Sequence, residues 1–68
     1  MNVSELKIRI KKDISKYNRD LSGGGLTQVQ KDYLGRCIDA GNEGLKMLDN
    51  GASVHVVWKY LMNPKSYN

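Results

Sequence analysis

Residues 51–62 read Gly-Ala-Ser-Val-His-Val-Val-Trp-Lys-Tyr-Leu-Met, and no other part of the chain constrains the architecture as strongly. Four apolar residues of this stretch recur at helical spacing and form one stripe: Val54, Val57, Trp58 and Leu61. Three more apolar residues fall outside that stripe: Val56, Tyr60 and Met62. We therefore predict a helix that is apolar around most of its circumference, and that lies between other helices or against a second chain.

The boundaries of this helix are marked by residues with known preferences. Ser53 is a typical N-cap, because its hydroxyl accepts a hydrogen bond from the first turn of a helix. Asn63 precedes Pro64, and a residue before proline avoids the helical region, which predicts that the helix ends there. We expect residues 1–63 to form a single helical domain and residues 64–68 to form a flexible C-terminal tail.

A second helix is predicted upstream, from Thr27 to about Asn50. Thr27 and Gln30 have the spacing of a capping box, and Asn50-Gly51 is typical of a helix C-terminus. The apolar positions between these signals are Val29, Tyr33, Leu34, Cys37, Ile38, Leu45 and Leu48. The helix is expected to need tertiary contacts, because each glycine in its interior costs about 1 kcal/mol relative to alanine.

Those interior glycines allow two interpretations. Cys37, Ala40, Gly41 and Gly44 form a strip of small residues at helical spacing, which would let another helix approach closely. Alternatively, Gly41-Asn42 ends one helix and begins another, which would give four short helices instead of three.

The N-terminal third predicts a helix over residues 3–20. Its apolar residues recur with steps of three and four: Val3, Leu6, Ile10, Ile14, Tyr17 and Leu21. Asn2 and Glu5 have the spacing of a capping box, although residues 6–11 also alternate with period two, as a short strand does. The glycines at 23–25 then break the pattern and predict a turn. The fold class expected is a small all-α domain of three helices.

Size and composition limit the possible functions. A chain of 68 residues has room for one small core of marginal stability, so we expect it to oligomerise, a homodimer being one form, or to bind a partner. The lone cysteine, Cys37, cannot form an internal disulfide, which favours a cytoplasmic location. No apolar run has the roughly 18 residues of a membrane span, and the N-terminus does not resemble a signal peptide.

Positive charge is concentrated in the first predicted helix. The first 22 residues contain six basic and three acidic residues, a balance of +3 out of a net charge of +4 for the chain. Arg9, Lys12, Lys16 and Arg19 recur with helical spacing and form a basic line beside the apolar one. Such a line is usually a solvated face, and it is also a candidate contact for nucleic acid or for an acidic partner.

Catalytic, cofactor and metal functions are not expected. His55 is the single histidine and has no evident catalytic partner, and Cys37 is expected to be an inert buried thiol. The glycines at 23–25 lack the following Lys-Ser/Thr of a phosphate-binding loop. The acidic residues of the second predicted helix are scattered and do not have the spacing of metal ligands. We therefore predict a non-enzymatic protein.

Residues 51–61 resemble the turn and second helix of bacterial helix-turn-helix repressors, with glycine in the turn and serine as the cap. This resemblance implies that His55, Lys59 and Val56 face the major groove while Trp58 belongs to the core. It does not extend upstream, where Lys46, Met47 and Asn50 replace the small or apolar residues of such motifs. It nevertheless makes a DNA-binding regulator, with a degenerate motif at residues 45–62, the alternative function.

The tail of the same helix, Val57-Trp58-Lys59-Tyr60, is similar to the C-terminal pattern of the Hha/YmoA group of small bacterial nucleoid-modulating proteins, together with Asp39 and Leu45. The other signature residues of that group are absent. Members of the group act by binding another protein, and this likeness implies the same mode of action.

These observations favour a small regulatory or inhibitory protein of the kind found in phages, mobile elements and bacterial regulatory loci. We expect it to bind a protein partner through its C-terminal helix, since large aromatic side chains dominate interface energetics. The predicted contact residues are Val56, Trp58, Lys59, Tyr60 and Met62. Contact with nucleic acid or an acidic partner would involve Arg9, Lys12, Lys16, Arg19 and His55.

Overall fold

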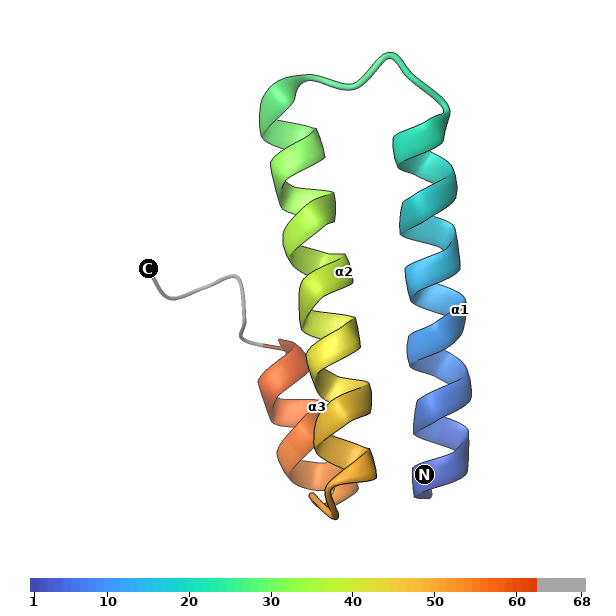
Figure 1. Ribbon diagram of the computed structural model, residues 1–68, viewed down its shortest axis with the longest axis vertical. Helices are drawn as coiled ribbons and strands as arrows, with labels where there is room; N and C mark the ends of the chain where they lie inside the picture. The colour runs from blue at the N-terminus through green and yellow to red at the C-terminus, as the bar shows by residue number, and fades with distance from the viewer. Residues whose placement is uncertain (63–68) are drawn as a thin grey trace.

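The computed structural model describes residues 1–62, which form three helices and no strand: α1 (Val3–Ser22), α2 (Gln28–Asp49) and α3 (Val54–Met62). α1 and α2 form a long antiparallel hairpin, and α3 folds back beside the half of α2 that is remote from the first loop (Figure 1). The predicted all-α class with three helices is confirmed. The strand alternative for residues 6–11 is wrong, and so is the helix break at Gly41-Asn42. The predicted tail, residues 64–68, lies outside the described residues.

The starts of the first two helices are set by local hydrogen bonds that were predicted from the sequence. The Asn2 side-chain oxygen accepts from the Glu5 backbone N–H at 2.8 Å, and the Glu5 carboxylate accepts from the Asn2 N–H at 2.9 Å. Thr27 and Gln30 exchange the same pair of bonds at the start of α2. Both capping boxes satisfy backbone donors that the helix itself leaves unpaired.

The turn between α2 and α3 is a tight reversal that depends on one glycine. Gly51 has φ +94°, a left-handed conformation that glycine adopts without steric cost. The Ala52 N–H donates to the Met47 carbonyl at 2.9 Å, and the Gly51 N–H donates to the Leu48 carbonyl at 3.1 Å, which is the bonding pattern of a Schellman motif. The Ser53 hydroxyl then accepts from the Val56 N–H at 3.2 Å, as expected of a cap. This turn directs α3 back along α2.

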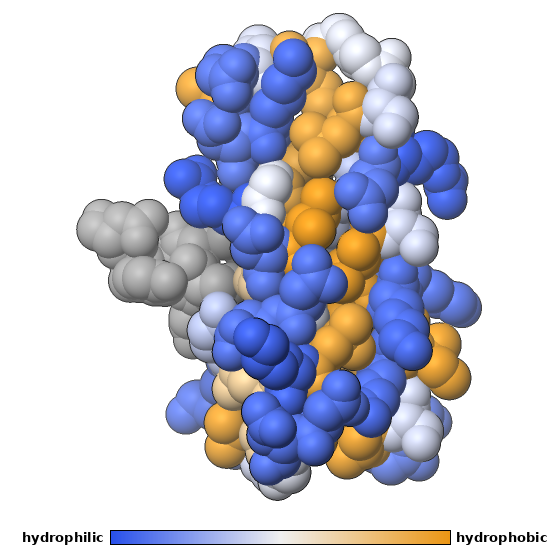
Figure 2. Space-filling view, viewed as in Figure 1, coloured by the Kyte–Doolittle hydropathy of each residue, from blue (hydrophilic) through white to orange (hydrophobic). Residues whose placement is uncertain are grey.

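All three helices contribute to one small core. Leu6 and Ile10 of α1, Leu48 of α2 and Val57 of α3 are buried together. Half-buried apolar residues pack around them, among them Ile14, Leu45, Trp58 and Leu61. The apolar stripe predicted for α3, Val54, Val57, Trp58 and Leu61, therefore faces the interior. Figure 2 shows that apolar surface also runs along the molecule between two hydrophilic bands.

The glycines of α2 are positions of close helix approach. A Cβ added at Gly41 would lie 2.9 Å from Ile14 Cγ1 of α1. A Cβ added at Gly44 would lie 3.3 Å from Val57 Cγ1 and from Leu61 Cδ2 of α3. The strip of small residues in α2 thus admits α1 and α3 to short distances, as the sequence suggested.

A surface ion pair joins the N-terminal part of α1 to the C-terminal end of α2. Lys7 Nζ lies 2.8 Å from Asp49 Oδ1, and this ammonium group lowers the pKa of the Asp49 carboxyl below its ordinary value. Because Asp49 is exposed, the pair contributes little to stability. Within residues 1–62, no helix is long and apolar enough to cross a bilayer.

Candidate functional site

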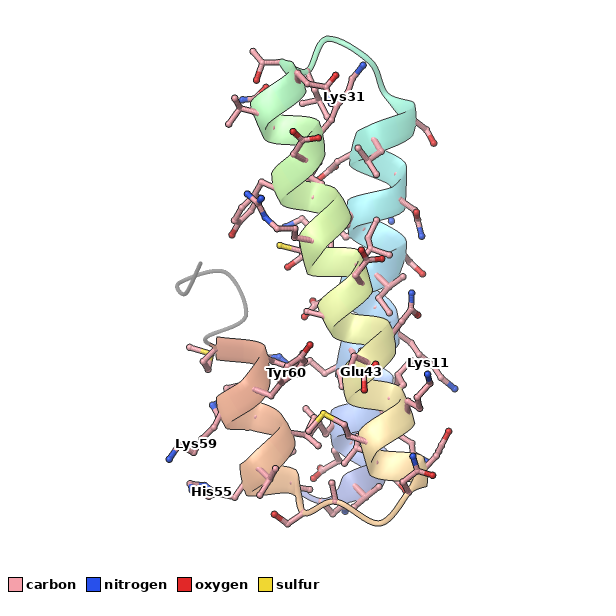
Figure 3. The ribbon with its side chains drawn as sticks, turned by 60° about the vertical axis from the view of Figure 1, so that its left-hand side comes forward. Lys11, Lys31, Glu43, His55, Lys59 and Tyr60 are labelled. Atoms are coloured by element: carbon pink, nitrogen blue, oxygen red, sulfur yellow. The ribbon has the colours of Figure 1, made fainter. Side chains whose placement is uncertain are left out.

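The residues predicted to bind a partner differ in exposure along α3. Val56 and Met62 are 50% and 61% exposed, so these two apolar side chains of α3 are accessible to a partner. Lys59 is exposed as well, whereas Trp58 and Tyr60 are half-buried. Figure 3 shows Tyr60 on the side of α3 that faces α2 and Glu43, while His55 and Lys59 point away from α2. The predicted set therefore divides between an outward face and the helix interface.

Trp58 connects α3 to α1. Its indole packs against the core, and the Arg9 guanidinium carbon lies 5.2 Å from the ring centroid, within the range of a cation–π interaction. Arg9 was predicted from the basic line as a contact for nucleic acid or an acidic partner. Its guanidinium also has this structural contact with α3, which sequence reasoning did not anticipate.

A groove begins where α3 ends. Its cavity volume is about 180 Å³, and Trp58, Leu61 and Met62 line its α3 side. Tyr17 of α1 and Cys37 of α2 also line the groove. The groove thus brings together two of the predicted contact residues, Trp58 and Met62, whereas Val56 is not among the residues that line it.

Tyr17 and Cys37 bring a hydroxyl and a thiol to this groove. Burial raises the pKa of the Tyr17 hydroxyl, and the neighbouring Cys37, Asp13 and Tyr33 raise it further. Tyr17 therefore stays a neutral hydroxyl, able to donate or accept a hydrogen bond, throughout the physiological range. Cys37 is a free, buried thiol. Within residues 1–62, no group of three or more histidine, cysteine, aspartate or glutamate side chains is placed to hold a metal ion.

The basic line of α1 is accessible along its length, since Arg9, Lys12, Lys16 and Arg19 are all exposed. The two arginines border different hollows: Arg9 lines the groove at the end of α3, and Arg19 lines a second hollow near the first loop. His55 is exposed and lies with Met1, Val54 and Trp58 around a shallow depression at the start of α3.

Sequence reasoning missed several of the residues that line the two hollows bordered by Arg9 and Arg19. Tyr17, Cys37 and Tyr33 were assigned to helix packing, and Arg36 was not considered as a contact. The predicted third helix is much shorter than the other two, and this difference in length was a signal that part of the hairpin would be left uncovered. Comparison with protein-family models, with curated proteins and with solved structures gives no significant match for this chain.

Proposed function

We propose that this chain is a small non-enzymatic regulatory protein that acts by binding another protein, with α3 as the contact element. The observation that carries the proposal is the exposure of Val56 and Met62 on a nine-residue helix whose other face is already packed in the core. Removing such side chains from water stabilises a complex by roughly 1–2 kcal/mol each. Lys59 and His55 beside them supply the polar rim that interfaces commonly have.

The proposal is tested by comparing capture of a partner by the wild-type chain and by Val56→Asp. Capture from cells of the source organism identifies the partner, and titration with the purified partner then gives its affinity. We expect Val56→Asp to weaken binding at least about tenfold, because a carboxylate in an apolar interface is left without a partner. Folding should be unaffected, since Val56 is half exposed and does not belong to the core cluster; far-UV circular dichroism checks this.

Ile8→Asp is the matched control, because Ile8 is an exposed apolar residue of similar exposure, 56%, on α1. We expect its affinity to stay within about twofold of wild type. Equal affinities of the partner for wild type and Val56→Asp would show that this surface of α3 is not part of the interface. Equal losses for Val56→Asp and Ile8→Asp would show that added negative charge, and not the α3 surface, governs binding.

DNA binding is the second candidate function, and the pattern of exposed residues on α3 supports it. His55, Val56 and Lys59 are exposed on α3 while Trp58 packs inward, which is the arrangement that the helix-turn-helix resemblance implies. Its test is a mobility shift with duplex DNA at low and high salt, since release of counterions makes such binding fall steeply with salt. We expect no shift at low salt. A salt-sensitive shift abolished by Lys12→Glu and Lys16→Glu would establish the second candidate instead.

A further inference from the structure

The third helix covers only part of the hairpin against which it packs. α3 has nine residues and spans about 13 Å, whereas the 22 residues of α2 span about 33 Å at 1.5 Å per residue. Figure 1 shows α3 ending near the middle of α2, well short of the loop that joins α1 to α2. Within residues 1–62, roughly 20 Å of hairpin, the length of about 13 helical residues, therefore has no third helix beside it.

An apolar hollow lies in this uncovered half; we call it the loop-end groove. It has a cavity volume of about 670 Å³, and its apolar lining comes from Leu26, Val29, Tyr33 and Leu34. Val29 is 76% exposed and Tyr33 is 45% exposed, so the groove is open to a ligand. Large side chains of this kind are normally covered, and several gathered in one hollow mark an interaction site.

The loop-end groove adjoins the groove at the end of α3. Tyr17 of α1 and Cys37 of α2 line the α3 groove, and Arg19 and Arg36, which are close to them along the same two helices, line the loop-end groove. The surface that α3 occupies thus extends toward the loop. A helix is the ligand that this surface already accepts within the chain.

The charges around the loop-end groove indicate what kind of helix fits. Arg19 of α1 and Arg36 of α2 line the groove, so each of the two helices that border it contributes one guanidinium group. Asp20 is the one acidic residue among its lining side chains. Arginine pairs strongly with carboxylates because its planar fork matches their two oxygens.

We propose that the loop-end groove binds an amphipathic helix of about three turns from an acidic partner protein, with leucine-type residues on Leu26, Val29 and Tyr33 and carboxylates against Arg19 and Arg36. A second copy of this chain fits less well. α1 has six basic residues against three acidic ones, α3 has no acidic residue, and the four acidic residues of α2 are offset by three basic ones. The chain as a whole has a net charge of +4, so two copies repel each other. This surface is distinct from the outward face of α3, so each of the two proposals can fail without the other.

The test uses two fluorescent synthetic peptides of about 14 residues with the same leucine stripe, one flanked by glutamates and the other by lysines, titrated with the full chain by fluorescence anisotropy. We expect saturable binding of the glutamate peptide and binding at least about tenfold weaker of the lysine peptide. Val29→Asp and Arg36→Glu should each weaken binding of the glutamate peptide about tenfold. Val29 lies in the first turn of α2, where an aspartate favours the helix, so that variant should fold.

Lys31→Glu is the matched control for charge, because Lys31 is an exposed base on α2 (Figure 3) and is not among the residues that line the loop-end groove. It should change the affinity less than about twofold. Val56→Asp should leave peptide binding unchanged, which separates this test from the test of the α3 surface.

Three results would overturn the proposal. The first is a glutamate peptide that does not bind or that binds Val29→Asp as well as wild type. The second is equal affinity for the two peptides. The third is sedimentation showing a wild-type dimer that Val29→Asp dissociates, since the groove would then be filled by a second copy.

Discussion

Leu6→Ala is expected to lower the free energy of unfolding by about 3 kcal/mol. Leu6 has no exposed surface and belongs to the buried cluster that contains Ile10, Leu48 and Val57, so its truncation leaves a cavity where the three helices meet. A domain this small has only about 3–5 kcal/mol of stability from its core, so a large part of the variant should be unfolded at 37 °C. Urea titration followed by the fluorescence of Trp58, the single tryptophan, measures the change.

Ile8→Ala serves as the control for Leu6→Ala, because it shortens an exposed aliphatic side chain on the same helix. Its stability should stay within about 0.5 kcal/mol of wild type. If Leu6→Ala were as stable as Ile8→Ala, Leu6 would not be at the junction of the helices, and the packing described for α1 would be wrong.

Gly44→Leu is expected to destabilise the fold by about 3 kcal/mol and to detach α3 from the hairpin. A Cβ at this position already lies 3.3 Å from Val57 Cγ1 and Leu61 Cδ2, and the remaining atoms of leucine have no space unless α3 moves away. The emission of Trp58 should shift toward the wavelength of solvated indole, while α1 and α2 keep most of the helical circular dichroism signal.

Gly35→Leu provides the matched control, since nothing lies within 4 Å of a Cβ added at Gly35. This variant should keep the native emission of Trp58 and gain up to about 1 kcal/mol, because leucine favours a helix interior more than glycine does. Native emission in Gly44→Leu would mean that α3 does not pack on Gly44.

The first two helices and the turns were predictable because the signals that define them are short-range. Asn2 with Glu5, and Thr27 with Gln30, satisfy the first backbone donors of their own helices, and Gly51 adopts a conformation that its neighbours require. The apolar stripe of α3 was predictable for a related reason, since helical periodicity depends only on spacing along the chain.

The continuity of α2 was not decided by such local signals. Gly41 and Gly44 are poor helix residues, and a break at Gly41-Asn42 was the alternative to the continuous helix. Ile14 of α1 packs against Gly41, while Val57 and Leu61 of α3 pack against Gly44. These contacts join residues more than ten positions apart, and they favour a straight helix whose glycines admit the neighbouring helices.

The candidate surfaces likewise include features that the sequence predicts and features that only the tertiary structure shows. The exposure of Val56 and Met62 follows from their positions outside the apolar stripe of α3. The contact of Arg9 with Trp58, and the meeting of Arg19 and Arg36 around the loop-end groove, unite side chains from different helices, and periodicity does not specify which residues of two helices lie side by side.

Sequence alone was therefore sufficient for the helix caps and for the apolar stripe of α3 that faces inward, because each depends on hydrogen bonds or spacing within a few residues. Tertiary packing alone established how far α3 reaches along the hairpin and which surface it leaves uncovered. That outcome depends on the direction in which the Gly51 turn sends the chain and on the volume that side chains of three helices fill together.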